Sequence, residues 1–267
     1  MRRPTDSRRD RGRRHACGGW RAAGLAALAL CAPGARGATP EELADVATQA
    51  DYAFFTEDRR AVSRLVANLG AFRESSDPLE LYSYALAEFR RLQLAARNHD
   101  ETEAESSGSA CLAALDKRAA TTPGDAEGLA LEAACAGYLA ELGGLRRLTA
   151  GRKRDASLAA ARALAPANPR VLLTRALTAW FGRGTSAAAR AETRAALIRA
   201  ASAFDAIAAA APGEPTWGGA EAWLFVGRAL EQDADLVGAR SAYERALLIA
   251  PDFAVARRRL GSLSSRR

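Results

Sequence analysis

Residues 219–261, GAEAWLFVGRALEQDADLVGARSAYERALLIAPDFAVARRRLG, decide the fold of this chain of 267 residues. Large and small residues recur there at fixed steps: Trp223, Val226, Gly227, Leu230, Ala239, Tyr243, Ala246 and Pro251. Leu260 and Gly261 lie 34 residues after Val226 and Gly227, so the pattern begins again in register. This spacing predicts two helices, a turn at the proline and the beginning of a third helix.

The segment resembles a tetratricopeptide repeat, whose signature includes a small residue where two helices cross, an aromatic residue and a terminal proline. The resemblance implies an all-α fold of antiparallel helix pairs stacked into a right-handed superhelix. It places a clean repeat at 220–253 and a C-terminal capping helix at 254–264. Weaker second-helix patterns end at Pro212, Pro166 and Pro123, at intervals of 39, 46 and 43 residues, and extend the resemblance over 110–267.

The segment before this array, residues 38–109, is predicted to be an N-terminal helical region. Thr39-Pro40-Glu41-Glu42 has the residues of a capped helix start, and that helix should run to about Phe55. Asp58 and the pair Asp77-Pro78 predict two further starts. Residues 97–109 are the most polar interior stretch, so a loop or a frayed helix start is expected there.

The first 37 residues have the order of a secretory signal peptide. Arginines precede an apolar run from Ala22 to Ala32, and Ala35-Arg36-Gly37 supplies a small-x-small end, which predicts cleavage after Gly37. A run of this length spans only about 16 Å as a helix, about half the hydrocarbon core, so no stable transmembrane span is expected. The mature protein should be periplasmic or secreted. A lipid anchor at Cys31 is the alternative, although Leu30 is larger than a lipoprotein site favours.

The positive charge of the chain resides in this leader. The full sequence carries a formal charge of +7, and residues 1–37 contain nine arginines and two aspartates. Without them the acidic and basic residues balance, so nucleic acid is not an expected partner. In layout the chain is similar to exported, divergent tetratricopeptide proteins of bacteria, which implies binding and scaffolding without catalysis.

Residues for metal, cofactor or nucleophilic chemistry are sparse after the leader. His99 is the single histidine there, and two cysteines and one histidine are too few for a zinc site of nitrogen and sulfur ligands. No Gly-x-Ser-x-Gly turn or phosphate-binding glycine loop occurs. We therefore predict no catalytic residues, no metal and no cofactor.

Cys111 and Cys135 are the best candidates for specific chemistry. Each lies 12 residues from Pro123, in the middle of a predicted turn, so two antiparallel helices would bring the cysteines to the same height. An exported protein could join them in a disulfide. Two buried thiols at helix crossings are the alternative.

The partner is expected on the helix that begins the clean repeat. The resemblance assigns Trp223, Val226, Gly227 and Leu230 to packing against neighbouring helices. The remaining residues Glu221, Leu224, Arg228 and Glu231 form a stripe that should line the concave surface. Arg170 and Trp180 would extend this stripe on an earlier helix. The mixed charges favour a protein or peptide, and a solvated helix face is the alternative. The second functional hypothesis is a small-molecule-binding component of a transport system, which a closed apolar cavity would favour.

Overall fold

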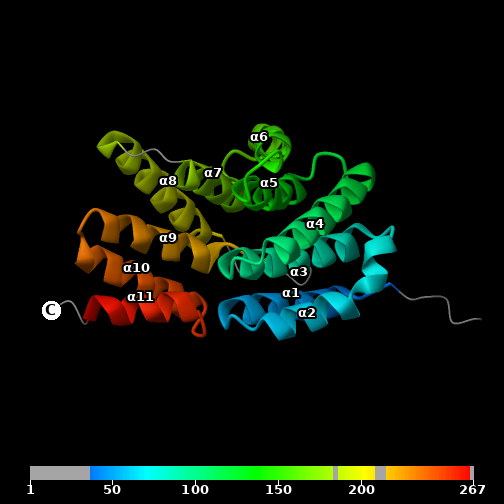
Figure 1. Cartoon of the computed structure of the whole chain (residues 1–267), viewed down its shortest axis with the longest axis horizontal. Helices are drawn as coiled ribbons and strands as arrows, with labels where there is room; N and C mark the ends of the chain where they lie inside the picture. The colour runs from blue at the N-terminus through cyan, green and yellow to red at the C-terminus, as the bar shows by residue number, and fades with distance from the viewer. Residues whose placement is uncertain (1–36, 183–185, 208–214, 265–267) are drawn as a thin grey trace, which may run out of the picture. The chain divides into compact units, whose positions relative to one another are not determined.

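The computed structural model describes residues 37–182, 186–207 and 215–264, which belong to one compact unit. These ranges are helical and contain no strand (Figure 1). The leader, with its cleavage site and Cys31, lies outside the described residues except for Gly37. The helices are α1 Pro40–Phe55, α2 Arg59–Asn68, η1 Gly70–Glu74 (3-10), α3 Pro78–Arg97, α4 Glu101–Thr121, α5 Ala126–Glu141, α6 Arg146–Leu164, α7 Pro169–Phe181, α8 Ala187–Asp205, α9 Gly219–Gln232, α10 Leu236–Ile249 and α11 Ala254–Ser264.

The predicted helix starts are confirmed. Thr39 and Glu42 form a capping box at α1, in which the Thr39 hydroxyl accepts from the Glu42 amide and the Glu42 carboxylate accepts from the Thr39 amide. Asp58 caps α2 and Asp77 caps α3, each through a carboxylate oxygen. These side chains satisfy amide groups that have no partner within the first turn of a helix.

The predicted loop at 97–109 is wrong for most of its length. Only residues 98–100 form a turn, and α4 runs unbroken from Glu101 to Thr121. Asp100 caps the helix, and Glu101 and Glu103 lie in its first turn, where carboxylates are favoured by the helix dipole. The polarity of this stretch thus reflects a well-capped helix start.

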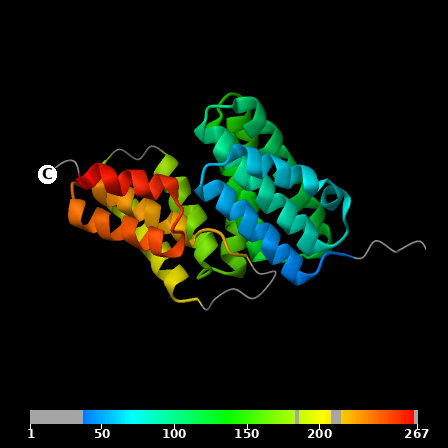
Figure 2. The same cartoon turned by 90° about the horizontal axis from the view of Figure 1, so that it is seen from below.

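The predicted all-α array of paired helices is confirmed in the described residues. The pairs are α3/α4, α5/α6, α7/α8 and α9/α10, with α1 and α2 preceding them (Figures 1 and 2). The proposed boundary between 109 and 110 falls inside α4, and the first pair of the array begins at Pro78. The helix α8 ends at Asp205.

The clean repeat packs as its sequence pattern indicates. Gly227 allows α9 to approach α10 so closely that a Cβ there would lie 2.6 Å from Cδ1 of Tyr243. Tyr243 is fully buried, and its hydroxyl donates to Glu231 at 2.8 Å. Trp223 reaches back to the preceding pair and donates its indole N–H to Asp205 on α8. The capping helix α11 covers the array with the predicted bounds.

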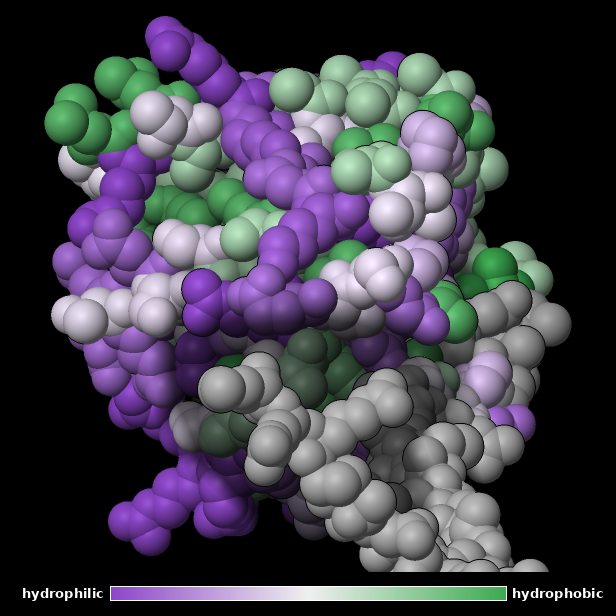
Figure 3. All heavy atoms as spheres, turned by 90° about the vertical axis from the view of Figure 1, so that its right-hand side faces the viewer, coloured by the Kyte–Doolittle hydropathy of each residue, from purple (hydrophilic) through white to green (hydrophobic). Residues whose placement is uncertain are grey.

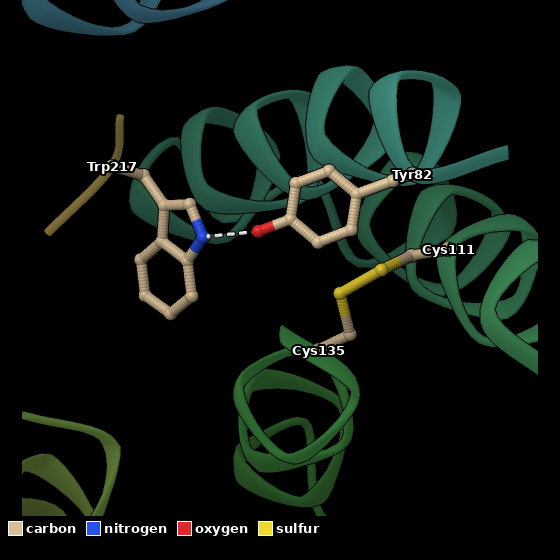
Figure 4. The surroundings of a disulfide bond; sticks show 4 residues. All are labelled: Tyr82, Cys111, Cys135 and Trp217. Atoms are coloured by element: carbon tan, nitrogen blue, oxygen red, sulfur yellow. Dashed lines mark hydrogen bonds between the residues drawn. A yellow bond between two sulfur atoms is a disulfide. The ribbon is translucent and has the colours of Figure 1, made fainter. Parts of the chain in front are cut away.

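A disulfide joins α4 to α5, and therefore joins two neighbouring helix pairs (Figure 4). The Cα atoms of Cys111 and Cys135 lie 6.6 Å apart, and both residues are buried. The two cysteines, each 12 residues from Pro123, thus lie at the same level on the adjacent helices α4 and α5. In the chain-entropy model a loop of this size stabilises the folded state by about 3–4 kcal/mol.

Replacement of Gly227 by alanine tests the close crossing of α9 and α10. We expect Gly227→Ala to lower the free energy of unfolding by about 1–3 kcal/mol, because the added methyl group overlaps a ring that cannot move. Chemical denaturation of the oxidised protein measures this change.

The matched control is Gly261→Ala, one repeat period later on α11, where an added Cβ meets nothing within 4 Å. Alanine is the better helix former by about 1 kcal/mol, so this variant should be neutral or more stable. Equal effects of the two substitutions would contradict the interpretation of Gly227.

Candidate functional site

The site is built around Arg90, a fully buried arginine on α3. Its Nε and Nη2 donate to Oδ1 of Asp51 on α1, at 2.8 and 2.6 Å. Its Nη1 donates to Gln93 at 2.9 Å and also to Glu221 on α9. The guanidinium carbon lies 4.3 Å from the centre of the Phe54 ring. One side chain therefore connects the N-terminal helices to the clean repeat.

The charges of this cluster depend on one another. Burial by itself would lower the pKa of Arg90, but Asp51 and Glu221 outweigh it and the pKa is raised. Burial raises the pKa of Asp51, and Arg90 opposes that change. Because neither carboxylate would tolerate this environment alone, the cluster is stable only when its cation is in place.

A second set of contacts holds the two ends of the array together. Phe253, between α10 and α11, packs against Phe54 and Phe55 with ring centres 5.9 and 4.7 Å apart. Glu57 accepts hydrogen bonds from Arg97 and from Arg258 on α11. These pairs lower the pKa of Glu57. The helices α1 to α3 and the clean repeat are thus fixed side by side.

The segment before α9 is anchored from two sides. The Trp217 indole donates to the Tyr82 hydroxyl at 2.9 Å (Figure 4). The Trp217 ring also meets Phe89 edge-on. Arg170 on α7 donates its Nε to the Trp217 carbonyl at 3.0 Å. It also donates to the Pro215 carbonyl and pairs with Glu127 on α5. This anchoring fixes where α9 begins.

A cavity of about 480 Å³ lies among the first helices of the four pairs. We call the side of α3, α5, α7 and α9 that lines this cavity the inner face. The wall is rich in aromatic and aliphatic side chains, including Phe89, Tyr138, Leu177, Phe181, Leu224 and Phe225. Burial raises the pKa of Tyr138, whose hydroxyl accepts from Gln93. A volume of this size falls within the range of about 300–1,000 Å³ that is typical of ligand sites.

The charged groups of the wall differ in how they are neutralised. Glu221 is bound by Arg90, Arg97 by Glu57, and Arg154 by its neighbour Asp155. Arg228 is different, since in the described residues no acid lies within ion-pair distance of it, and its guanidinium carbon lies 5.3 and 5.0 Å from the centres of the Trp180 and Phe225 rings. Burial lowers its pKa, and the nearby Arg259 lowers it further.

The six residues predicted to form a partner groove have different environments. Arg170, Glu221 and Leu224 are buried, with exposures of 5, 5 and 4%, so the first two serve the contacts described above. Glu221, Leu224 and Arg228 line the cavity, whereas Trp180 packs edge-on against Phe225 beside it. Glu231 lies apart, where it accepts from Tyr243 and Arg259. The stripe on α9 is therefore largely internal to the chain.

Chemical groups for catalysis are not gathered in this wall. His99, with φ of 58°, lies in the turn after α3 and is exposed at the cavity rim. Among the described residues, no group of three or more histidines, cysteines and acids is placed to hold a metal ion. Within the same ranges no helix is long and apolar enough to cross a membrane. The face drawn in Figure 3 is mainly hydrophilic, with scattered hydrophobic residues where grey atoms leave it visible.

Sequence reasoning missed Asp51 and Arg90. Arg90 and Glu221 are 131 residues apart, so no local pattern connects them. One signal in the sequence could have identified Arg90. The helix α3 carries charged residues at positions that, in an amphipathic helix, face the core, and such residues need buried partners.

Comparison with known proteins adds little to this geometry. No protein-family model and no curated protein matches the chain. Among solved structures, it is similar to a thermophilic tetratricopeptide protein from Thermus thermophilus. The two chains are 18% identical, the match covers 85% of this chain and 100% of the other, and the TM-score is 0.49. The description of the fold rests on the contacts of this chain.

Substitution of Arg90 tests the central cluster. We expect Arg90→Met to reduce the free energy of unfolding by about 3–5 kcal/mol at neutral pH, because two buried carboxylates lose their cation. Thermal and denaturant unfolding measure the loss.

The double variant Arg90→Met with Glu221→Gln removes one of those charges and should recover part of that loss. Arg240→Met is the control, since Arg240 forms an exposed i,i+4 pair with Glu244 on α10. A loss below about 1 kcal/mol for Arg90→Met would show that the cluster contributes no more than a surface pair.

Proposed function

We propose that this chain is a non-catalytic binding protein of the bacterial cell envelope, and that its inner face holds the bound molecule. One observation carries the proposal: the first helices of four successive pairs surround a cavity of about 480 Å³. Tetratricopeptide-like arrays leave this side of the first helices free of the packing between pairs. The wall offers binding surface without an assembled set of catalytic groups.

The cavity favours a small molecule over an extended peptide. Contacts of Arg90, Phe253 and Glu57 hold the N-terminal helices against the clean repeat, and they occupy part of the inner face. A long groove would need that face to be open along several pairs. The proposal therefore gives first place to a small ligand, such as one passed to a transport system.

A protein partner is the second candidate, and a feature of the outer surface favours it. Val237 and Leu248 on α10 are 83 and 82% exposed, and Ile249 beside Leu248 is 52% exposed. Val237 lies at the start of α10, and Leu248 and Ile249 lie about 16 Å away at its end, so these side chains would offer a protein partner two separate apolar contacts. A scaffold could use this surface while the cavity binds a ligand.

Blocking the cavity tests the first proposal. The neutral dye N-phenyl-1-naphthylamine should bind the wild-type chain at one saturable site, with a rise in dye fluorescence. Thr178 lines the cavity from α7 and is partly buried, so Thr178→Trp should weaken binding at least tenfold. Fluorescence titration measures both affinities.

Ala179→Trp is the matched control, because Ala179 is the next residue on α7 but is exposed and lies outside the cavity wall. It should bind the dye as the wild type does. No saturable binding to the wild type, or equal effects of the two tryptophans, would refute the cavity as the binding site.

Export is tested on the chain made in its own host. The order of basic, apolar and small residues in the leader supports cleavage after Gly37, which lies at the start of the described residues. Intact-mass analysis of the extracytoplasmic fraction should give a chain that begins at Ala38. Retention of Met1, or recovery only in the cytoplasm, would refute this part of the proposal.

A further inference from the structure

The inference concerns the chemical class of the ligand, and it rests on the proposed function of the cavity. Arg228 lies seven residues after Glu221 on α9, on the same inner face. A partly buried guanidinium loses hydration, and in folded proteins that loss is normally offset by a carboxylate. In the described residues no carboxylate lies within ion-pair distance of Arg228.

The side chains around Arg228 do not supply hydrogen-bond acceptors for its guanidinium. Trp180 and Phe225 contact the cation through their rings, which leaves N–H groups without acceptors from these neighbours. Of the nearby charged groups, Arg259 adds positive charge, and Glu231 accepts hydrogen bonds from Tyr243 and Arg259. Burial lowers the pKa of Arg228 most, Arg259 lowers it further, and the more distant charge of Glu231 only partly opposes this change.

The other charged groups of the wall are already neutralised or hydrated. Arg97 and Arg154 have their own acids, and Arg90 binds Glu221. Glu101 and Glu141 lie at exposed positions, where water screens their charge. On α7, Thr174 is 4% exposed, lines the cavity, and its Oγ1 has no hydrogen-bond partner in the described part of the chain.

We infer that the cavity binds a small apolar molecule with one carboxylate, and that Arg228 receives the carboxylate. The planar fork of N–H donors matches the two oxygens of a carboxylate. The apolar body of the ligand would lie along Leu177, Phe181 and Leu224. A cationic ligand would be repelled by Arg228, and a neutral one would leave it unpaired.

The test compares acids with their neutral amides. Octanoate and 4-phenylbutyrate, each beside its primary amide, are used to displace N-phenyl-1-naphthylamine from the wild-type protein. Each acid should bind at least tenfold more tightly than its amide. In Arg228→Met, which keeps an apolar side chain of similar length, this ratio should fall to within threefold of unity, mainly through weaker binding of the acid.

Two further variants separate charge from fold. Arg154→Gln removes a cation that also lines the cavity but has its own partner, so the ratio should stay at the wild-type value. Arg228→Lys keeps the charge and should keep a preference for the acids of at least threefold. Circular dichroism verifies that each variant is folded.

Three results would overturn the inference. The first is equal binding of acids and amides by the wild type, and the second is a ratio that Arg228→Met does not change. The third is tighter binding of a short peptide with a free C-terminal carboxylate than of either acid. If the dye itself does not bind, the proposed function fails as well, so the two failures are distinguishable.

Discussion

The guanidinium of Arg90 is the group on which the arrangement of the helices depends. It lies on α3, and its partners Asp51 and Glu221 come from α1 and α9, so it joins the first quarter of the chain to the last. A tetratricopeptide-like array usually needs only contacts between neighbouring pairs. Here a buried ion cluster imposes a long-range constraint on a fold otherwise built from local ones. Burial of the three charged groups costs desolvation free energy. The cluster therefore serves mainly to specify one arrangement of α1, α3 and α9, and adds less to the free energy of unfolding.

This constraint creates the cavity. If α9 were held only by α8 and α10, nothing would fix its distance from α3, because the segment between them spans several helix pairs. Glu221 solves this with its two carboxylate oxygens: Oε1 accepts from Arg90, and Oε2 accepts from the Gly218 amide at the start of α9 at 3.2 Å. The same residue therefore caps the helix and positions it. Trp217, one residue before that amide, adds an indole hydrogen bond to Tyr82 on α3.

The sequence predicted what depends on neighbouring residues and missed what depends on distant ones. The Thr39 cap, the crossing of Gly227 with Tyr243, and the helix at 254–264 follow from patterns of a few dozen residues, and each was found. A loop or a frayed helix start was predicted at 97–109, and the loop failed because acids at a helix start resemble a solvated loop in composition. Glu221 was assigned to a free stripe because the repeat pattern identifies the inner face of α9 but contains no information about what covers it. That face is covered by α3, through an arginine whose partners are 39 and 131 residues away.

Arg90 and Arg228 show how one architecture divides structure from binding. Arg90 is fully buried, and its guanidinium N–H groups are distributed over two carboxylates and an amide, so it has little capacity to bind anything else. Arg228 has the opposite environment, with aromatic rings at its side and, in the described residues, no carboxylate within ion-pair distance. A cation held by rings gives up hydration without gaining a counter-ion, which stabilises the free protein less than an ion pair would. An anionic ligand that enters the cavity would give Arg228 the ion pair that the free protein lacks. The binding of that ligand would therefore stabilise the folded protein, and it would favour anions over neutral molecules.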